Sequence, residues 1–96
     1  MVSKDEIERV LEKAMHPEFD KSLAECGMIR AIDIEQNKVV VTLVVPFLHV
    51  PIKEELIRII KSTIKEQTGI EAEVKINEMN EKEKKKFGKV VKEVRG

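Results

Sequence analysis

The side chains best suited to chemistry in this sequence are two histidines, His16 and His49, and one cysteine, Cys26. Glu18 follows His16 closely, and together these residue types offer borderline and hard metal ligands. Protein metal sites usually contain closely spaced pairs such as His-x-x-x-His or Cys-x-x-Cys, and the sequence has no such pair. We therefore expect capping or surface roles for the two histidines, and no metal bound by the chain alone.

The single cysteine limits both disulfide formation and cluster binding. Cys26 has no partner for an internal disulfide, and an iron–sulfur cluster needs several thiolates, of which a dimer would offer two. Because Cys26 precedes Gly27 at the expected entry to a strand, we predict that it is a small buried apolar residue. One reduced cysteine, with no apolar run long enough to span a bilayer, indicates a cytoplasmic protein.

Catalysis by this chain is not expected. The sequence has no second thiol, no plausible order of Ser, His and Asp for a triad, and no paired carboxylates that a predicted fold clearly brings together. A binding function is therefore the simpler expectation.

A loop between two prolines, Pro46 and Pro51, is the best candidate for a binding site. The seven residues before it, 39–45, are apolar on both faces of a strand and must be buried, so the end of that strand is held rigidly. The loop itself contains Phe47 and Leu48 and leads to a helix that should begin at Pro51. Function should therefore concentrate around residues 46–51.

The elements that position this loop follow from hydrophobic periodicity and capping residues. Ser3 and Glu6 form a capping box for a first helix that should end near Met15, because Pro17 disfavours helical backbone at His16. The expected later elements are a hairpin of strands 28–35 and 38–45, a helix from Pro51 to the residue before Gly69, a one-faced strand over 70–76, and a helix over 81–94.

This order, α-β-β-α-β-α, predicts an α+β two-layer domain with a three-stranded mixed sheet. A right-handed crossover should place the third strand parallel to the valine strand, which then lies in the middle, with the first two helices on one face. The other face would expose Ile29, Ala31, Val40 and Val44. A second subunit or the terminal helix should cover them, the helix using Phe87, Val90, Val91 and Val94.

Composition indicates one domain over residues 1–96. The chain is 42% hydrophobic and 38% charged, with 18 basic and 18 acidic residues, and its bias toward Lys and Glu suggests a thermophile source. Residues 80–96 carry seven Lys or Arg against three Glu. Because the two signs are interleaved, we expect a solvated helix face in this segment, with nucleic-acid binding as the alternative.

Several of these segments resemble one known family. They are His16-Pro17-Glu18 after the first helix, Gly27 before the first strand, the hydrophobic second strand, and the Pro46-Phe47 step leading to Pro51. Over roughly residues 5–80 the chain resembles the MIP18-like or DUF59 domain of iron–sulfur cluster assembly. It is most similar to the N-terminal domain of Mrp-type iron–sulfur carrier ATPases.

This resemblance implies the predicted fold and a role in building or delivering iron–sulfur clusters. Many members carry a reactive cysteine directly before the proline that begins the second helix, where a helix N-terminus lowers the thiol pKa. Val50 stands at that position here. The chain also lacks a phosphate-binding Gly-Lys-Ser/Thr loop, so the resemblance implies neither a cluster held by this chain alone nor ATPase activity.

We therefore predict an accessory domain that docks a carrier ATPase or a client protein through the loops at 16–20 and 46–51. Phe47 and Leu48 would be the apolar anchors, with Glu18 and His49 as the polar rim. Two alternatives remain: a self-associating structural module, and weak nucleic-acid binding through the basic C-terminal helix. The predicted partner-binding residues are His16, Pro17, Glu18, Pro46, Phe47, Leu48, His49, Val50 and Pro51.

Overall fold

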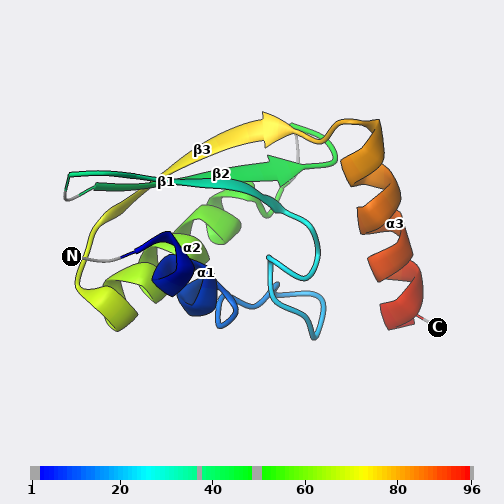
Figure 1. Cartoon of the computed structure of the whole chain (residues 1–96). Coiled ribbons are helices and arrows are strands. Elements are labelled where there is room, and N and C mark those ends of the chain that lie inside the picture. The colour runs from blue at the N-terminus through cyan, green and yellow to red at the C-terminus, as the bar shows by residue number, and fades with distance from the viewer. Residues whose placement is uncertain (1–2, 37, 49–50, 96) are drawn as a thin grey trace.

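The computed structural model describes residues 3–36, 38–48 and 51–95, and it contains the predicted order of elements (Figure 1). Val94 was expected to cover the sheet, but its side chain lies outside the described part. The elements are α1 (Lys4–Leu11), β1 (Ile29–Glu35), β2 (Lys38–Val45), α2 (Lys53–Thr68), β3 (Ala72–Glu78) and α3 (Glu81–Arg95).

The three strands form one mixed sheet in the order β1-β2-β3, which confirms the predicted topology. β1 and β2 pair antiparallel from Glu35 opposite Lys38, and β2 and β3 pair parallel from Val39 opposite Ala72. The valine strand therefore lies in the middle. Figure 1 shows α1 and α2 together on one face, while α3 stands at the end of the sheet where β2 and β3 terminate.

The first helix is shorter than predicted, and the expected end near Met15 is wrong. Ser3 caps it as expected, with Oγ accepting a hydrogen bond from the Glu6 N–H over 3.2 Å. The N–H groups of Glu12, Lys13 and Ala14 then bond three residues back instead of four, which tightens and ends the helix. Met15 next pairs with Ser22 in an isolated bridge, so the chain leaves the helix after Leu11.

The second helix and third strand also begin later than predicted. Pro51 is not the first helical residue, because Ile52 is the N-cap with φ −85° and ψ 6°, and the helix begins at Lys53. Its end at Gly69 is as expected, with the left-handed φ of 77° that glycine allows. The N–H of Ile70 donates to Thr68 Oγ1, so strand pairing starts only at Ala72 instead of residue 70.

An irregularity in β1 corrects the predicted faces of that strand. Ile29 pairs with Leu43 but Ala31 pairs with Thr42, so Arg30 is an extra residue in the strand. Side chains of paired residues share a face, which places Ile29 with Leu43 on one face and Ala31 with Thr42 on the other. The prediction that Ile29 and Ala31 lie on the same face is therefore wrong.

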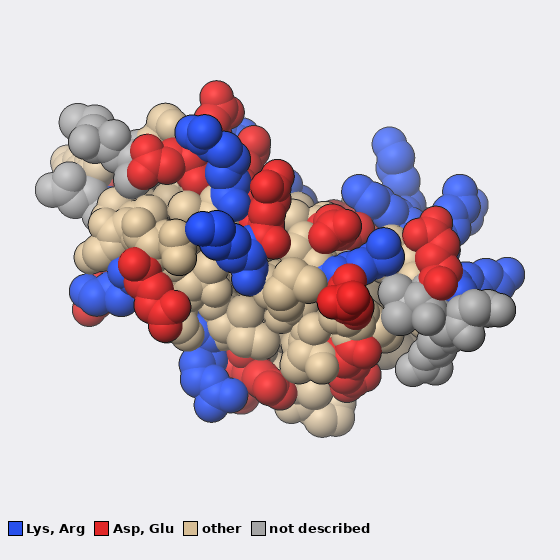
Figure 2. Space-filling view, turned by 90° about the horizontal axis from the view of Figure 1, so that it is seen from below, with Lys and Arg blue, Asp and Glu red and all other residues tan. Residues whose placement is uncertain are grey.

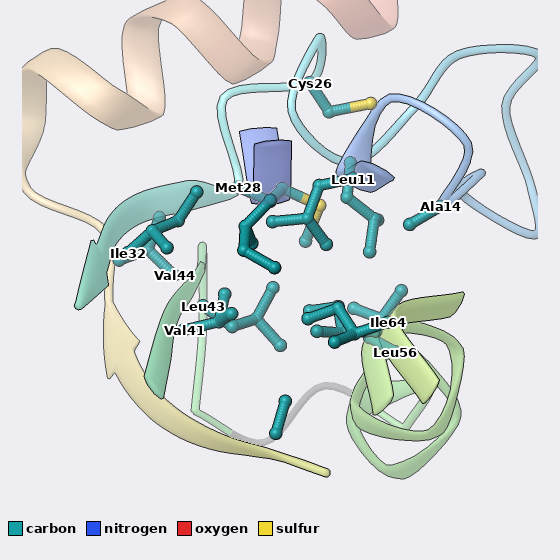
Figure 3. Packing of buried hydrophobic residues seen from close by; sticks show 14 of the residues in the cluster. Leu11, Ala14, Cys26, Met28, Ile32, Val41, Leu43, Val44, Leu56 and Ile64 are labelled. Carbon is teal, nitrogen blue, oxygen red and sulfur yellow. The ribbon is translucent and has the colours of Figure 1, made fainter. Parts of the chain in front are cut away.

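The core lies between the sheet and the α1–α2 layer and continues around the end of β2 (Figure 3). It consists mainly of Ile, Val and Leu side chains. Val44 is fully buried and belongs to the same cluster as Met79 and Val90, so α3 covers the end of the sheet. Val40, farther from α3, is only 7% exposed and is flanked on its face by Asp33 and Glu73.

Candidate functional site

A cavity of about 350 Å³ lies where the end of β2, the start of α2, the segment after α1, and α3 meet. It brings together the two loops predicted to form the site, since residues of both segments line it. Among the described residues the wall is mainly apolar, and only His16 and Glu18 add ionisable groups to it. The lining residues are His16, Glu18, Phe19, Met28, Pro46, Pro51, Ile52, Phe87 and Val91.

His16 is a buried turn residue, only 4% exposed. Its Nδ1 accepts a hydrogen bond from the Glu18 N–H over 3.0 Å, its own N–H donates to the Lys21 carbonyl oxygen, and its ring stacks on Phe19 at 4.3 Å between centroids. Burial lowers the pKa of His16, although the negative charges of Glu18 and Glu55 oppose this shift. His16 therefore acts as a neutral acceptor that fixes the turn.

Two reciprocal hydrogen bonds between Ser22 and Glu25 stabilise the segment after His16. Ser22 N–H donates to Glu25 Oε1 and Glu25 N–H donates to Ser22 Oγ, each over 3.1 Å. The bond from the Ser22 N–H, and next the Ser22 side chain, lower the pKa of the Glu25 carboxylate. Cys26 follows and is fully buried, which agrees with the predicted apolar role. Burial raises the pKa of the Cys26 thiol, aided by the nearby Glu25 charge, so it is a poor nucleophile.

The loop after β2 presents apolar side chains to solvent. Phe47 is 65% exposed and Leu48 is 46% exposed, and Pro17 in the neighbouring turn is also exposed. His49 and Val50, the other predicted site residues in this loop, lie outside the described residues. The loop thus carries two exposed apolar side chains beside a mainly apolar cavity.

Comparison with known proteins identifies the family. The model of the iron–sulfur cluster assembly protein family matches residues 4–76, which is most of the chain. The chain belongs to this family. Its membership supports a role in iron–sulfur cluster assembly and confirms the MIP18-like or DUF59 resemblance at that level.

A solved structure shows that the fold is also shared. A crystal structure of a DUF59 domain of unknown function from Bacillus anthracis matches this iron–sulfur assembly domain with a TM-score of 0.66 and 16% sequence identity. The match covers 88% of this chain and 91% of that chain. No curated protein matches the chain. The special likeness to Mrp-type N-terminal domains stays a prediction.

The described residues of this assembly domain do not offer a ligand set for a cluster or a metal. Within residues 3–36, 38–48 and 51–95, no three His, Cys, Asp or Glu side chains are grouped to hold a metal ion. The one thiol, Cys26, is buried with a raised pKa. No helix in the described part is long and apolar enough to cross a membrane.

Several cavity residues were not predicted as site residues. Phe19 stacks on His16 and meets Phe87 of α3 edge to face, with 6.1 Å between the ring centroids. Phe87 and Val91 are four residues apart and so share one side of α3, which was predicted only to cover the sheet. Helical periodicity identifies an apolar side, but it does not reveal which part of the fold that side contacts.

Proposed function

We propose that this domain is an accessory docking module in iron–sulfur cluster assembly or carriage. Phe47 and Leu48 provide the apolar anchors, and Glu18 provides part of the polar rim. The observation that carries the proposal is the exposure of Phe47 and Leu48 at the loop beside the mainly apolar cavity. Large exposed apolar side chains cost solvation free energy, and partner binding recovers it.

The proposed partner is a cluster-carrying ATPase of the Mrp type or a client protein that receives the cluster. Family membership supports protein partners in cluster assembly, and the sequence resemblance favours the carrier. Because the described part of the chain has one buried thiol, we propose that the partner supplies the cluster ligands. The domain then contributes recognition and positioning, and no catalytic step.

Docking can be tested with a purified Mrp-type carrier ATPase and the double variant Phe47→Ser/Leu48→Asp. We expect the wild-type domain to bind and the variant to bind at least about tenfold more weakly, since buried apolar anchors commonly contribute more than 1 kcal/mol each. Lys38→Asp is the control, because it introduces the same charged side chain at the opposite end of β2. Equal binding by all three proteins would refute docking through this loop.

The absence of a resident cluster has its own test. The purified domain is incubated anaerobically with iron and sulfide, desalted, and examined by absorption spectroscopy. We expect no visible cluster bands, because the described residues provide no complete thiolate set. Bands that persist after desalting and disappear in Cys26→Ala would show that the chain binds a cluster directly.

A further inference from the structure

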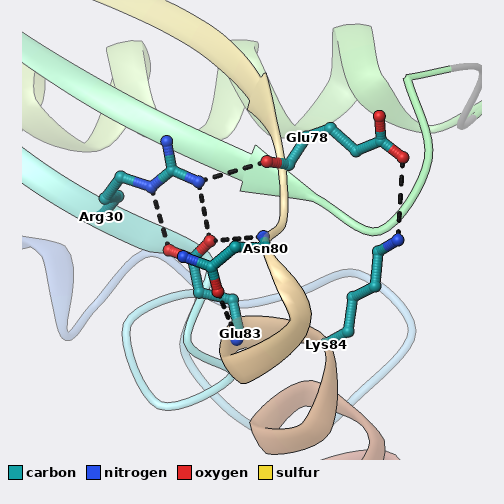
Figure 4. A network of polar contacts seen from close by, with 5 residues as sticks. All are labelled: Arg30, Glu78, Asn80, Glu83 and Lys84. Atoms are coloured by element: carbon teal, nitrogen blue, oxygen red, sulfur yellow. Dashed lines mark hydrogen bonds and ion pairs between the residues drawn. The ribbon is translucent and has the colours of Figure 1, made fainter.

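The C-terminal helix lies outside the segment that matches the family, which ends at residue 76. A compact polar network joins its first turn to the sheet (Figure 4). Arg30 forms two hydrogen bonds with the Glu83 carboxylate, at 2.7 and 3.0 Å, and a third with the Glu78 carbonyl oxygen. Asn80 and Glu83 cap each other reciprocally at 2.9 and 2.8 Å. This network therefore fixes the orientation of α3 at its first turn, just after β3 ends.

One side of α3 is part of the candidate site. Phe87 and Val91 line the cavity, and Val90 is 8% exposed within the core cluster. The aliphatic part of Lys86 lies over Gly27, because a Cβ added at Gly27 would lie 3.2 Å from Lys86 Cδ. Any molecule that enters this cavity therefore contacts α3.

The remaining surface of α3 is strongly basic. Glu83 is paired with Arg30, and Glu78 of β3 is paired with Lys84 at 3.8 Å, so these two carboxylates offset Arg30 and Lys84 and leave the other α3 lysines without an ion pair to them. The exposed carboxylates on the described part of α3 are Glu81 and Glu93. Figure 2 shows Lys and Arg side chains gathered around this end of the molecule. The exposed lysines are Lys82, Lys85, Lys86, Lys89 and Lys92.

We infer that the cavity and α3 together bind an acidic segment of a partner protein, with one apolar side chain in the cavity and neighbouring carboxylates on the α3 lysines. The inference rests on the docking function proposed above and specifies the chemistry of the partner. Apolar burial supplies affinity, while the lysines select the charge of the flanking residues.

A protein segment fits this surface better than a nucleic acid. Glu18 lines the same cavity, and a nucleic acid would bring a phosphate charge at every nucleotide. A peptide can confine its carboxylates to the α3 side. Phe19 and Phe87 are half-buried against each other, so they do not present open faces for base stacking.

The test uses the full chain and two fluorescein-labelled peptides of equal length, one with a leucine flanked by glutamates and one with the same leucine flanked by lysines. Fluorescence anisotropy at low salt should give at least about tenfold tighter binding of the glutamate peptide, and added salt should weaken it. In Lys86→Glu/Lys92→Glu, which changes the lysine packed over Gly27 and the lysine next to Val91, this preference should disappear. The matched control, Lys61→Glu/Lys65→Glu, makes the same charge change on α2 and should leave it intact.

A second measurement locates the bound peptide without any core substitution. Methionine methyl groups are followed by NMR, with Met28 as the reporter in the cavity wall and Met79 as a buried reporter outside it. We expect the glutamate peptide to shift the Met28 signal and to leave the Met79 signal unchanged. Binding without a Met28 shift would contradict insertion into the cavity.

Other outcomes overturn the inference in distinguishable ways. Equal affinity for the two peptides would show that the α3 lysines do not select acidic flanking residues. A single-stranded oligonucleotide that binds through Lys86 and Lys92 while the peptides do not would replace the protein partner with nucleic acid. If Phe47→Ser/Leu48→Asp abolishes carrier binding but Lys86→Glu/Lys92→Glu does not, docking stands and this inference fails. If the glutamate peptide binds but no carrier does, the acidic-segment inference stands and docking to a carrier fails.

Discussion

At the scale of single residues, His16 makes stability depend on pH. Its pKa in the folded protein is below the ordinary value of 6.5, mainly because it is buried. The unfolded chain therefore binds more protons as the pH falls below about 6.5, and folding loses stability on acidification. Protonation also places a hydrogen on Nδ1, which accepts the Glu18 N–H bond.

We predict that the melting temperature falls between pH 7.5 and 5.5, and that His16→Asn reduces this dependence. Asparagine can retain a side-chain acceptor but does not titrate. Thermal unfolding followed by circular dichroism checks this. Glu83 titrates in a lower range, since its pKa is about 2, held down mainly by its hydrogen bonds with Arg30. A wild-type protein that is more stable at pH 5.5 would contradict the assignment.

Replacing glycine by alanine should have opposite effects on stability at two positions, Gly27 and Gly88. Gly27 has φ of +75°, where L side chains are strained, so Gly27→Ala should destabilise by about 1–2 kcal/mol. Gly88 lies inside α3, is exposed and has no atom within 4 Å of an added Cβ, so Gly88→Ala should stabilise that helix by up to about 1 kcal/mol. Urea unfolding of both variants measures the change in the free energy of unfolding, which should fall for Gly27→Ala and rise for Gly88→Ala.

At the scale of elements, the Arg30–Glu83 contact is the main polar attachment of α3. Arg30→Ala removes it without touching the core, since Arg30 is exposed. We predict several-fold faster amide hydrogen exchange in the first turn of α3, with little change in the exchange of β2. Lys38→Ala is the control, because it breaks an exposed 2.6 Å ion pair with Glu73 that does not involve α3. Equal exchange in the two variants would mean that α3 is held by its apolar contacts.

Local signals predicted most elements because their causes are local. The Ser3 cap, the left-handed Gly69 and the continuous valine run each fix a boundary or burial by nearby residues alone. The extra residue Arg30 was missed because a strand irregularity depends on its pairing partner. The terminal helix was expected to cover the open face of the sheet and covers only its Val44 end, because apolar periodicity does not specify which surface a helix contacts. Predicting the cavity requires knowing how the strands pair and which surface α3 contacts. Only the cavity residues in the two loops were therefore predicted.

At the scale of the whole molecule, the open face of the sheet offers little apolar area to a second copy. Thr42 and Val40 are each less than 10% exposed, and their neighbours across the sheet include Lys75 and Glu73. We predict a monomer in light scattering, with Val40→Lys causing no change in mass. Val44 is unsuitable for this test because it is fully buried, and a lysine there would disrupt the core. A dimer that Val40→Lys dissociates would support the self-association alternative.

The parallel pairing of β2 with β3 also governs how the chain folds. Glu35 of β1 pairs with Lys38 of β2, three residues later in the chain, whereas Val39 pairs with Ala72, which follows the whole of α2 in the chain. Closing the longer loop costs more chain entropy, so the hairpin can form early and β3 must dock late. α3 follows β3 directly, and its side of the cavity is therefore completed at the end of folding. During synthesis or refolding, the hairpin and α2 would expose apolar side chains until β3 pairs with β2.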